Sequence, residues 1–276
     1  MPELPEVETV RRGLHPVLHG RRLTRVVTRR ENLRFPFPDG FGQALTGRQV
    51  TAVERRAKYL LITLDRDVVL ICHLGMSGSF RIYPDNPPIL DAHDHVLFLT
   101  SENVEIRYHD PRRFGSMDIC PLDRLGDYPA LKKLGPEPVA PGLAGSHLAD
   151  RLRGRQMPIK SALLDQRVVA GIGNIYACEA LFDAAISPRR RAAAVQAGRA
   201  DKLARSIDAV LSRAIDAGGS SLRDHRQPSG ELGYFQHSFR VYGRTGEACP
   251  RCRDGTPIRQ ITQAGRSTFF CSRCQR

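Results

Sequence analysis

Residues 249–274, CPRCRDGTPIRQITQAGRSTFFCSRC, contain the strongest fold signal of this 276-residue chain. Two CxxC pairs, Cys249 with Cys252 and Cys271 with Cys274, enclose 18 residues. This spacing is typical of a zinc ribbon, in which four thiolates hold one tetrahedral zinc and tie the ends of a β-hairpin. Two disulfides or spare thiols are the alternatives, but a cytoplasmic chain and the paired spacing disfavour them. The sequence therefore predicts one structural zinc.

The predicted zinc site also indicates that catalysis takes place elsewhere. Four thiolates leave zinc no open position for water or substrate. Between the two cysteine pairs, Gly265 permits a tight turn, and Arg266 should lie at or near the tip of the hairpin. In so basic a chain Arg266 is a candidate phosphate contact, although a solvated loop arginine is an equal alternative.

The composition indicates a globular protein with a polyanionic partner. Lys and Arg number 42 against 29 Asp and Glu, which gives a formal net charge of +13. Such a surplus attracts acidic ligands. The basic residues are spread along the whole chain, which favours nucleic acid over a membrane surface. No segment reaches the roughly 20 apolar residues that cross a bilayer, and the acidic start does not resemble a signal peptide. We therefore expect a cytoplasmic monomer that binds no membrane.

Upstream of the hairpin, the chain divides into a β-rich half and a helical half. One amphipathic helix is predicted over residues 5–18, and short apolar runs such as KYLLITL and VVLICHL predict hairpins of a sandwich or a barrel. Prolines and glycines in LGPEPVAPG indicate a linker, after which Ala- and Leu-rich segments predict helices. The expected divisions are an N-terminal domain over 1–133, a linker over 134–152, a helical domain over 153–240 and a zinc finger over 241–276.

Residues 1–10, MPELPEVETV, place a proline directly after Met1. Removal of Met1 would leave Pro2 with a free secondary amine, and α-amino groups titrate at about 7.7 to 8.0, so a good fraction is unprotonated near neutral pH. Such an amine can attack a sugar aldehyde carbon and form an iminium. Glu3 could then protonate the sugar ring oxygen, and Lys58, one of only five lysines, could hold a phosphate or assist proton transfer. The alternative is a proline that only starts a helix.

Three further motifs contain residue types that suit a DNA partner. GIGNIY places Asn174 as the N-cap of a helix, whose free N–H groups can hold a phosphate, although an ordinary turn is more common. HLGMSG and DPRRFG each place large side chains on a loop bounded by Gly or Pro: Met76 in the first, and Arg112 and Phe114 in the second. These side chains could fill the space left by an extruded base. The alternative is that Met76 and Phe114 cover the core.

The motifs together resemble one known family. PELPEVETVRRGL, RRAKYLL, HLGMSG, DPRRFG, LGPEP, GIGNIYACEALF, VYGRTGEAC and the cysteine pairs are similar, in this order, to the bacterial formamidopyrimidine-DNA glycosylases, and the match runs end to end. The resemblance implies a two-domain α+β fold, in which a β-sandwich with a flanking helix precedes a helical helix-two-turns-helix domain that ends in a four-cysteine zinc finger. It also implies a bifunctional DNA glycosylase and AP lyase of base excision repair, which acts on oxidised purines in double-stranded DNA at the bacterial nucleoid.

The resemblance assigns roles to particular residues. It implies that Pro2 is the Schiff-base nucleophile and Glu3 a proton donor, and that Lys58 and Arg266 bind the phosphates flanking the lesion and donate protons during β,δ-elimination. The implied phosphate or DNA contacts are His73, His93, Arg112, Arg155 and Asn174, and the implied wedge is Met76, Arg112 and Phe114. Arg155 stands where many relatives have lysine.

A further segment, GGSSLRDHRQPSGELG over 218–233, follows a predicted long helix and is rich in Gly and Ser. Related enzymes use the corresponding loop to cover the flipped base, and Ser220, Ser221 and Arg223 offer polar groups for that task. For this composition a plain surface connection is the alternative.

Two other functions match parts of the sequence. Endonuclease VIII is a relative that prefers oxidised pyrimidines, but PELPEVET and the Met/Arg/Phe wedge favour the purine enzyme. A non-catalytic zinc-ribbon DNA-binding protein would need neither a processed Pro2 nor Lys58. Borohydride trapping on abasic DNA separates both enzymes from such a binding protein.

Overall fold

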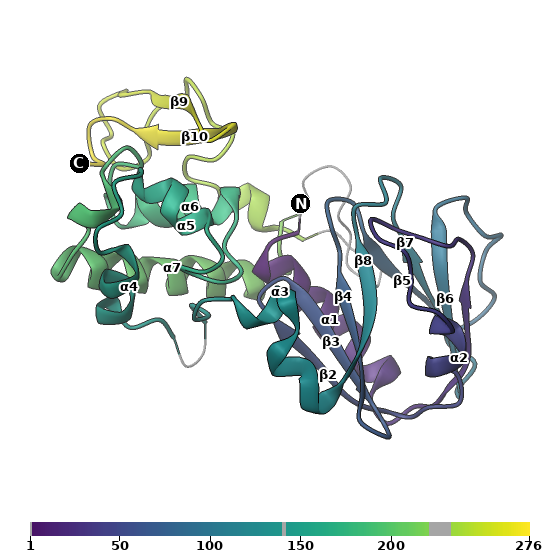
Figure 1. Ribbon diagram of the computed structural model, residues 1–276. Coiled ribbons are helices and arrows are strands. Elements are labelled where there is room, and N and C mark those ends of the chain that lie inside the picture. Colours follow the sequence, from purple (N-terminus) through teal and green to yellow (C-terminus); the bar gives the residue numbers. More distant parts are fainter. Residues whose placement is uncertain (1, 140–141, 221–232) are drawn as a thin grey trace. The chain divides into compact units, whose positions relative to one another are not determined.

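The computed structural model describes residues 2–139, 142–220 and 233–276 (Figure 1). The chain forms two compact units. The first, here called the sandwich unit, comprises Met1–Lys132 and Ala217–Tyr234, and the second, the helical unit, comprises Lys133–Asp216 and Phe235–Arg276. The described residues 217–220 and 233–234, which follow helix Gly198–Asp216 in the sequence, therefore belong to the sandwich unit.

The sandwich unit contains two four-stranded antiparallel sheets (Figure 1). In spatial order, the first sheet consists of β1 (Leu23–Thr28), β6 (Asp94–Thr100), β7 (Glu105–His109) and β5 (Ser79–Tyr83). The second consists of β2 (Val50–Arg56), β3 (Tyr59–Leu64), β4 (Val68–His73) and β8 (Ser116–Pro121). Short linkers let β2, β3 and β4 pair in sequence order as a meander. The sequence left a sandwich or a barrel open, and two separate sheets make it a sandwich.

The first helix, α1 (Leu4–Leu18), belongs to the core of this unit. Its apolar residues Val7, Val10, Leu14 and Leu18 recur at helical spacing and join one buried cluster with inward-facing residues of both sheets. Pro5 lies in the first turn, where its missing N–H removes no hydrogen bond. The helix predicted over residues 5–18 is confirmed. A short helix, α2 (Phe41–Leu45), lies against β1, and α3 (Pro129–Lys132) follows a 3-10 turn over Leu122–Asp127.

The helical unit is built around α6 (Asn174–Asp183), which is buried from Ile175 to Phe182. It contacts α5 (Ile159–Leu164), the long helix α7 (Gly198–Asp216) and the hairpin strand β10 (Arg266–Cys271). The helix α4 (Gly145–Leu152) packs against α7, and two 3-10 turns, Ala192–Ala194 and Phe235–Ser238, complete the unit. The switch from a β-rich to a helical half is therefore confirmed. Among the helices of the described residues, none combines the length and the apolar character needed to cross a bilayer.

The C-terminal hairpin pairs β9 (Ile258–Gln263) with β10 in antiparallel register, with Gln263 opposite Arg266. Gly265, at a φ of 71°, closes the turn in the left-handed region that glycine tolerates best. The hairpin alone has few apolar residues, and its core is completed by Cys178 and Phe182 from α6. Arg266 lies exposed at the hairpin tip, as its position in the sequence predicted.

Candidate active site and nucleic-acid interface

A buried carboxylate fixes the beginning of α1. Pro2 and Glu3 are both buried, and Glu3 occupies the N-cap position. The Glu3 backbone N–H donates to Glu6 Oε2 at 2.9 Å. Glu6 Oε1 accepts two further hydrogen bonds, from the backbone N–H of Ser220 at 2.8 Å and from its hydroxyl at 2.9 Å. One carboxylate therefore holds the peptide between Pro2 and Glu3 and also holds Ser220, the last described residue before position 221.

Glu6 was not singled out from the sequence, although a signal for it exists. It stands three residues after Glu3, which is the spacing of a capping box. That signal predicts the bond to Glu3 but not the one to Ser220. Gly219 makes the second contact possible, because a Cβ there would lie 3.2 Å from Glu6 side-chain atoms. Of the predicted loop residues, Ser221 and Arg223 lie outside the described residues.

Lys58 and His73 meet at one end of the second sheet. Lys58 is buried in the turn between β2 and β3, and His73 ends β4 opposite Tyr59, with the two rings 4.9 Å apart. Burial, with the positive charges of Lys58 and Arg34 nearby, lowers the pKa of His73 to about 4, so the ring is neutral at physiological pH. His73 Nδ1 accepts the Gly75 N–H at 3.0 Å, which leaves the ring proton on Nε2. His73 can thus donate one neutral hydrogen bond to a phosphate.

Arg34 is a second residue of this region that was not predicted from the sequence. Its backbone N–H donates to the Gly115 carbonyl at 3.0 Å, and its charge acts on His73. Its guanidinium lies 5.4 Å from the ring centre of Phe35, which is 59% exposed. The sequence NLRF contains the same Arg-Phe pair as PRRF. This repeat was the sequence signal that pointed to Arg34. Arg34 therefore adds a cation beside the predicted wedge.

The predicted wedge residues stand on two neighbouring loops of the sandwich unit. Met76, between β4 and β5, is 40% exposed, and Phe114, between β7 and β8, is 43% exposed. The Arg112 guanidinium lies 4.9 Å from the centre of the Phe114 ring. Gly75 touches the Phe114 backbone so closely that a Cβ would come within 2.3 Å of it. Neither Met76 nor Phe114 covers the core, because both side chains project outward.

His93 lies at the edge of the same region. Its carbonyl accepts the Asp110 N–H at 3.0 Å, and its ring centre is 5.8 Å from that of His109 and 6.2 Å from that of His95. The buried carboxylate of Asp94 holds His109 Nδ1 at 2.9 Å. His93 itself is exposed and could contact a ligand.

In the helical unit, two helices support the strand that follows Arg266. Asn174 Nδ2 donates to the Ser267 carbonyl at 2.9 Å. Lys160, which is fully buried on α5, donates from Nζ to the same carbonyl at 3.1 Å and to Thr268 Oγ1 at 2.7 Å. No role was predicted for Lys160, although a lysine in a chain so rich in arginine was a signal.

The predicted N-cap at Asn174 is wrong. Gly173 occupies the cap position and α6 begins at Asn174, because the Asn174 amide is used for the hairpin rather than for the helix. Arg155 is half-exposed and already has partners within the unit. Its Nη1 lies 3.3 Å from Asp165 Oδ2, and its Nε donates to the Arg151 carbonyl at 2.8 Å.

The four predicted metal ligands converge. The Sγ atoms of Cys249, Cys252, Cys271 and Cys274 all lie within 4.8 Å of one another, and the pairs Cys249–Cys274 and Cys252–Cys271 are 3.8 and 3.7 Å apart. A tetrahedral zinc with Zn–S bonds of about 2.3 Å requires sulfur atoms about 3.8 Å apart. The donor set therefore fits one structural zinc, and the predicted cofactor is confirmed.

The remaining three cysteines are not zinc ligands. Cys72, Cys120 and Cys178 are buried, as expected for core residues.

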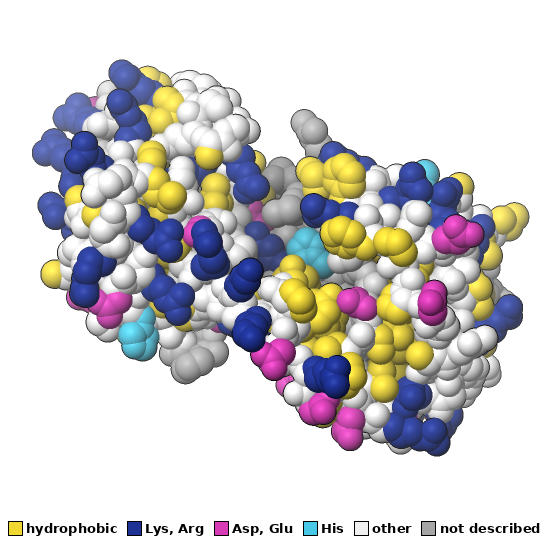
Figure 2. All heavy atoms as spheres, viewed as in Figure 1, with side chains coloured by type: hydrophobic (Ala, Val, Ile, Leu, Met, Phe, Trp, Pro, Cys, Tyr) yellow, Lys and Arg dark blue, Asp and Glu magenta, His cyan; other side chains and the backbone are white. Residues whose placement is uncertain are grey.

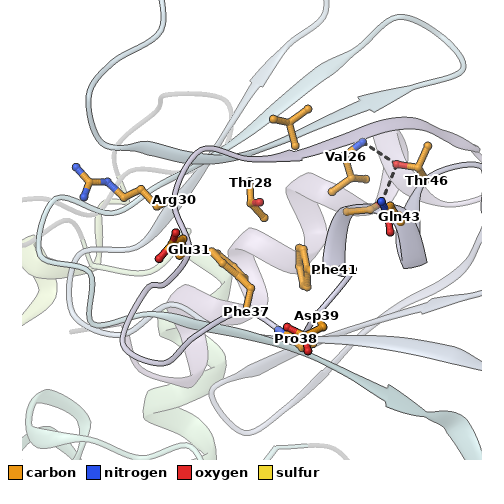
Figure 3. Close-up of a pocket in the computed structure, with 13 residues that line it drawn as sticks. Val26, Thr28, Arg30, Glu31, Phe37, Pro38, Asp39, Phe41, Gln43 and Thr46 are labelled. Atoms are coloured by element: carbon orange, nitrogen blue, oxygen red, sulfur yellow. Dashed lines mark hydrogen bonds between the residues drawn. The ribbon is translucent and has the colours of Figure 1, made fainter.

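A cavity of about 790 Å³ lies between β1 and α2, where Phe37 and Phe41 line one side (Figure 3). None of the predicted site residues lines this cavity.

On the face shown in Figure 2, Lys and Arg side chains spread over the helical unit with few carboxylates among them.

Comparisons with known proteins extend over the whole chain. Residues 1–117 match the formamidopyrimidine-DNA glycosylase N-terminal domain, residues 134–226 the H2TH domain of the same proteins, and residues 246–276 the zinc finger found in FPG and IleRS. A formamidopyrimidine-DNA glycosylase of Beijerinckia indica is 55% identical over 289 residues, with all of both chains covered. The chain belongs to the formamidopyrimidine-DNA glycosylase family.

Solved structures of formamidopyrimidine-DNA glycosylases agree with this membership. A Lactococcus lactis FPG mutant in complex with a Fapy-dG-containing DNA superposes with a TM-score of 0.91 at 36% identity, and all of both chains is covered. The MutM (FPG) protein of Thermus thermophilus gives a TM-score of 0.87 at 41% identity, with 99% of this chain and 98% of that chain covered. The predicted fold and enzyme class are confirmed: the chain is a DNA glycosylase of base excision repair. The interpretation as a non-catalytic zinc-ribbon protein is wrong.

Proposed function

We propose that this formamidopyrimidine-DNA glycosylase removes oxidised purines from double-stranded DNA and then cleaves the resulting abasic site through Pro2. The observation that carries the proposal is the buried N-cap of α1, where Glu6 holds the Pro2–Glu3 peptide. An amine at this position would be presented at the start of a rigid helix, with a carboxylate, Glu3, on the next residue. DNA of this type is what the structural relatives contain: Fapy-dG DNA in one Lactococcus lactis complex and an abasic site in another.

The chemistry can be written for the residues of this chain. The Pro2 nitrogen attacks C1′ of the damaged nucleotide while the bond from C1′ to the base breaks, and the departing base takes up the proton that the Pro2 amine loses. Glu3, in its protonated form, then gives its proton to the ring oxygen as the sugar opens to the iminium. The resulting iminium acidifies the C2′ proton. Loss of the C2′ proton expels the 3′ phosphate, and a second elimination expels the 5′ phosphate. Water then hydrolyses the iminium and frees Pro2. Zinc has no step in this scheme; when bound, it holds the hairpin that carries Arg266.

The remaining residues bind and position the DNA. Lys58 and Arg266 provide cations for the phosphates on either side of the lesion and protons for the eliminations. His73 provides a neutral N–H, because its pKa is lowered by burial and by nearby cations. Asn174 and His93 provide hydrogen-bonding groups, and Arg155 a further cation. Met76, Arg112 and Phe114 fill the space of the extruded base. Ser220, with Ser221 and Arg223, would cover that base. The substrate implies work at the nucleoid in the bacterial cytoplasm.

Trapping with borohydride tests the proposal. The enzyme is mixed with duplex DNA containing an abasic site, the iminium is reduced, and mass spectrometry locates the DNA on the protein. We expect the adduct on Pro2 and no adduct when Met1 is retained, because an amide nitrogen cannot form an iminium. A crosslink at Lys58 would overturn the assignment.

One observation favours a broader lesion range. A Lactococcus lactis Fpg structure at 36% identity contains an oxidised-pyrimidine DNA, with a TM-score of 0.90. Excision rates measured side by side on 8-oxoguanine and on an oxidised pyrimidine decide between the ranges. We expect the purine to be removed faster; the opposite order would favour the specificity of endonuclease VIII.

A further inference from the structure

The two wedge loops are joined through one buried carboxylate for which the sequence indicated no role. Asp110 is fully buried at the end of β7. Its Oδ1 accepts the Ser77 hydroxyl at 2.5 Å, and its Oδ2 accepts the Gly115 N–H at 2.8 Å. Ser77 is the neighbour of Met76, and Gly115 is the neighbour of Phe114. Asp110 therefore bonds to the residue directly after each exposed hydrophobic side chain.

Ser77 adds a second connection between the loops. While its hydroxyl donates to Asp110, its oxygen accepts the backbone N–H of Arg112 at 3.2 Å. The loop of Met76 is thus bonded both to the carboxylate and to the backbone of the arginine loop.

The two loops pack closely around the Tyr108 hydroxyl. A Cβ at Gly115 would lie 1.7 Å from the Tyr108 hydroxyl, and one at Gly78 would lie 2.3 Å from it. The Tyr108 hydroxyl in turn donates to Asp110 Oδ2 at 3.4 Å. Burial, with the Asp110 carboxylate nearby, raises the pKa of Tyr108, so this hydroxyl stays protonated as a donor. Glycine is required at these two positions because a Cβ at either would collide with the Tyr108 hydroxyl.

The carboxylate of Asp110 is bonded by neutral groups. Among the described residues, the groups that bond this carboxylate are the Ser77 and Tyr108 hydroxyls and the Gly115 amide. An apolar side chain of similar size would leave the Ser77 hydroxyl, the Gly115 N–H and the Tyr108 hydroxyl without this acceptor. The carboxylate therefore gathers donors from both loops and from Tyr108 on β7.

We propose that Asp110 is a positioning residue that locks the loops of Met76 and of Arg112 and Phe114 into one rigid wedge before DNA is bound. The inference rests on the proposed function, in which these side chains replace an extruded base. Unstacking and extruding a base already costs binding energy. A wedge that is ordered in advance adds no further ordering cost at that moment.

Matched serine substitutions test the inference. Ser77→Ala removes the link between the loops and leaves Asp110 in place. Ser79→Ala is the control: Ser79 is also buried, lies two residues further along, and has only a long 3.5 Å bond to the His109 carbonyl. Asp110→Asn is the second variant, and Met76→Ala is the reference for a damaged wedge.

Two readouts are compared on the full-length protein. The first is the single-turnover rate of 8-oxoguanine excision from duplex DNA, and the second is the rate of borohydride trapping at a preformed abasic site. A 2-aminopurine placed opposite the lesion reports displacement of the stack. We expect Ser77→Ala to lower both the excision rate and the rate of the 2-aminopurine fluorescence change by about tenfold. This is the effect of one lost charge-assisted hydrogen bond. Trapping should stay near the wild-type rate, and Ser79→Ala should change neither.

Non-additivity separates positioning from a loss of stability. In a Met76→Ala background, Ser77→Ala should have little further effect on excision, because the side chain that it positions is gone. Full additivity would overturn the inference. If Met76→Ala slows excision while Ser77→Ala and Asp110→Asn do not, the positioning role is wrong and the wedge remains. If Met76→Ala itself has no effect, the wedge of the proposed function is wrong.

Discussion

Replacing Glu6 by glutamine should uncouple the N-terminal amine from the rest of the sandwich unit. Within the described part of the chain, the wild-type carboxylate accepts three hydrogen bonds, one from the Glu3 N–H at Oε2 and two from Ser220 at Oε1. A glutamine side chain would place one carbonyl oxygen and one amide nitrogen in the same volume. With the oxygen toward Ser220, the amide nitrogen faces the Glu3 N–H, so a donor meets a donor.

The magnitude follows from this count. The better orientation of the glutamine loses one hydrogen bond to a charged acceptor, which is worth about 1.5–3 kcal/mol. If that whole loss appears in the transition state for attack by Pro2, the rate falls by about ten- to 150-fold, since about 1.4 kcal/mol corresponds to one factor of ten. Ser220→Ala removes only the hydroxyl bond and keeps the backbone bond, so its effect should be smaller.

The assay is the single-turnover rate of borohydride trapping on abasic duplex DNA, measured with the free energy of unfolding. Glu8→Gln is the matched control, since Glu8 is also buried on α1 but bonds to Arg11 and Arg55. Burial opposes ionisation of Glu8, but the hydrogen bonds and charges of both arginines outweigh it and lower its pKa. Glu8→Gln should therefore reduce stability while trapping stays unchanged.

Two outcomes would refute the reasoning about Glu6. Trapping at the full rate in Glu6→Gln would mean that the capping bond does not orient Pro2. Equal slowing in Glu6→Gln and Glu8→Gln would mean that both act through the stability of α1.

Two further predictions concern the zinc site and the pH dependence. Cys249→Ser should abolish zinc binding, loosen the β9–β10 hairpin and weaken DNA binding through Arg266, while the sandwich unit keeps its melting transition; full affinity in zinc-free protein would contradict this. The pKa of His73 is about 4 in the folded protein and about 6.5 in the unfolded chain. Between these two pH values the unfolded chain holds a proton on His73 that the folded protein does not. The free energy of unfolding should therefore rise with pH from 4 to 6.5. His73→Gln should remove up to about 3 kcal/mol of this rise. Urea titrations at a series of pH values measure the free energy of unfolding, and the same pH dependence in wild type and variant would contradict the prediction.

The sequence predicted the features that local spacing encodes. Two CxxC pairs predict a zinc hairpin because each pair forms one short turn and presents two thiolates together. Apolar residues at helical spacing predict α1, and short apolar runs between turn residues predict the strands. Local context left alternatives open for the residues of MPE, RAKY and the wedge loops, and their roles followed from the resemblance of the ordered motifs to one family.

Tertiary structure alone decided how distant residues meet. Ser220 and Glu6 are 214 positions apart, and Lys160 reaches Thr268 across 108 positions. Such contacts leave no periodicity in the sequence, because they depend on the path of the backbone through the whole unit. Asp110 shows the same limit at shorter range: the sequence shows an aspartate before a proline, and only the folded loops show that its two oxygens bond the neighbours of Met76 and of Phe114. Hydrogen bonds act over about 3 Å, so their partners are fixed only when packing has brought the chain segments together.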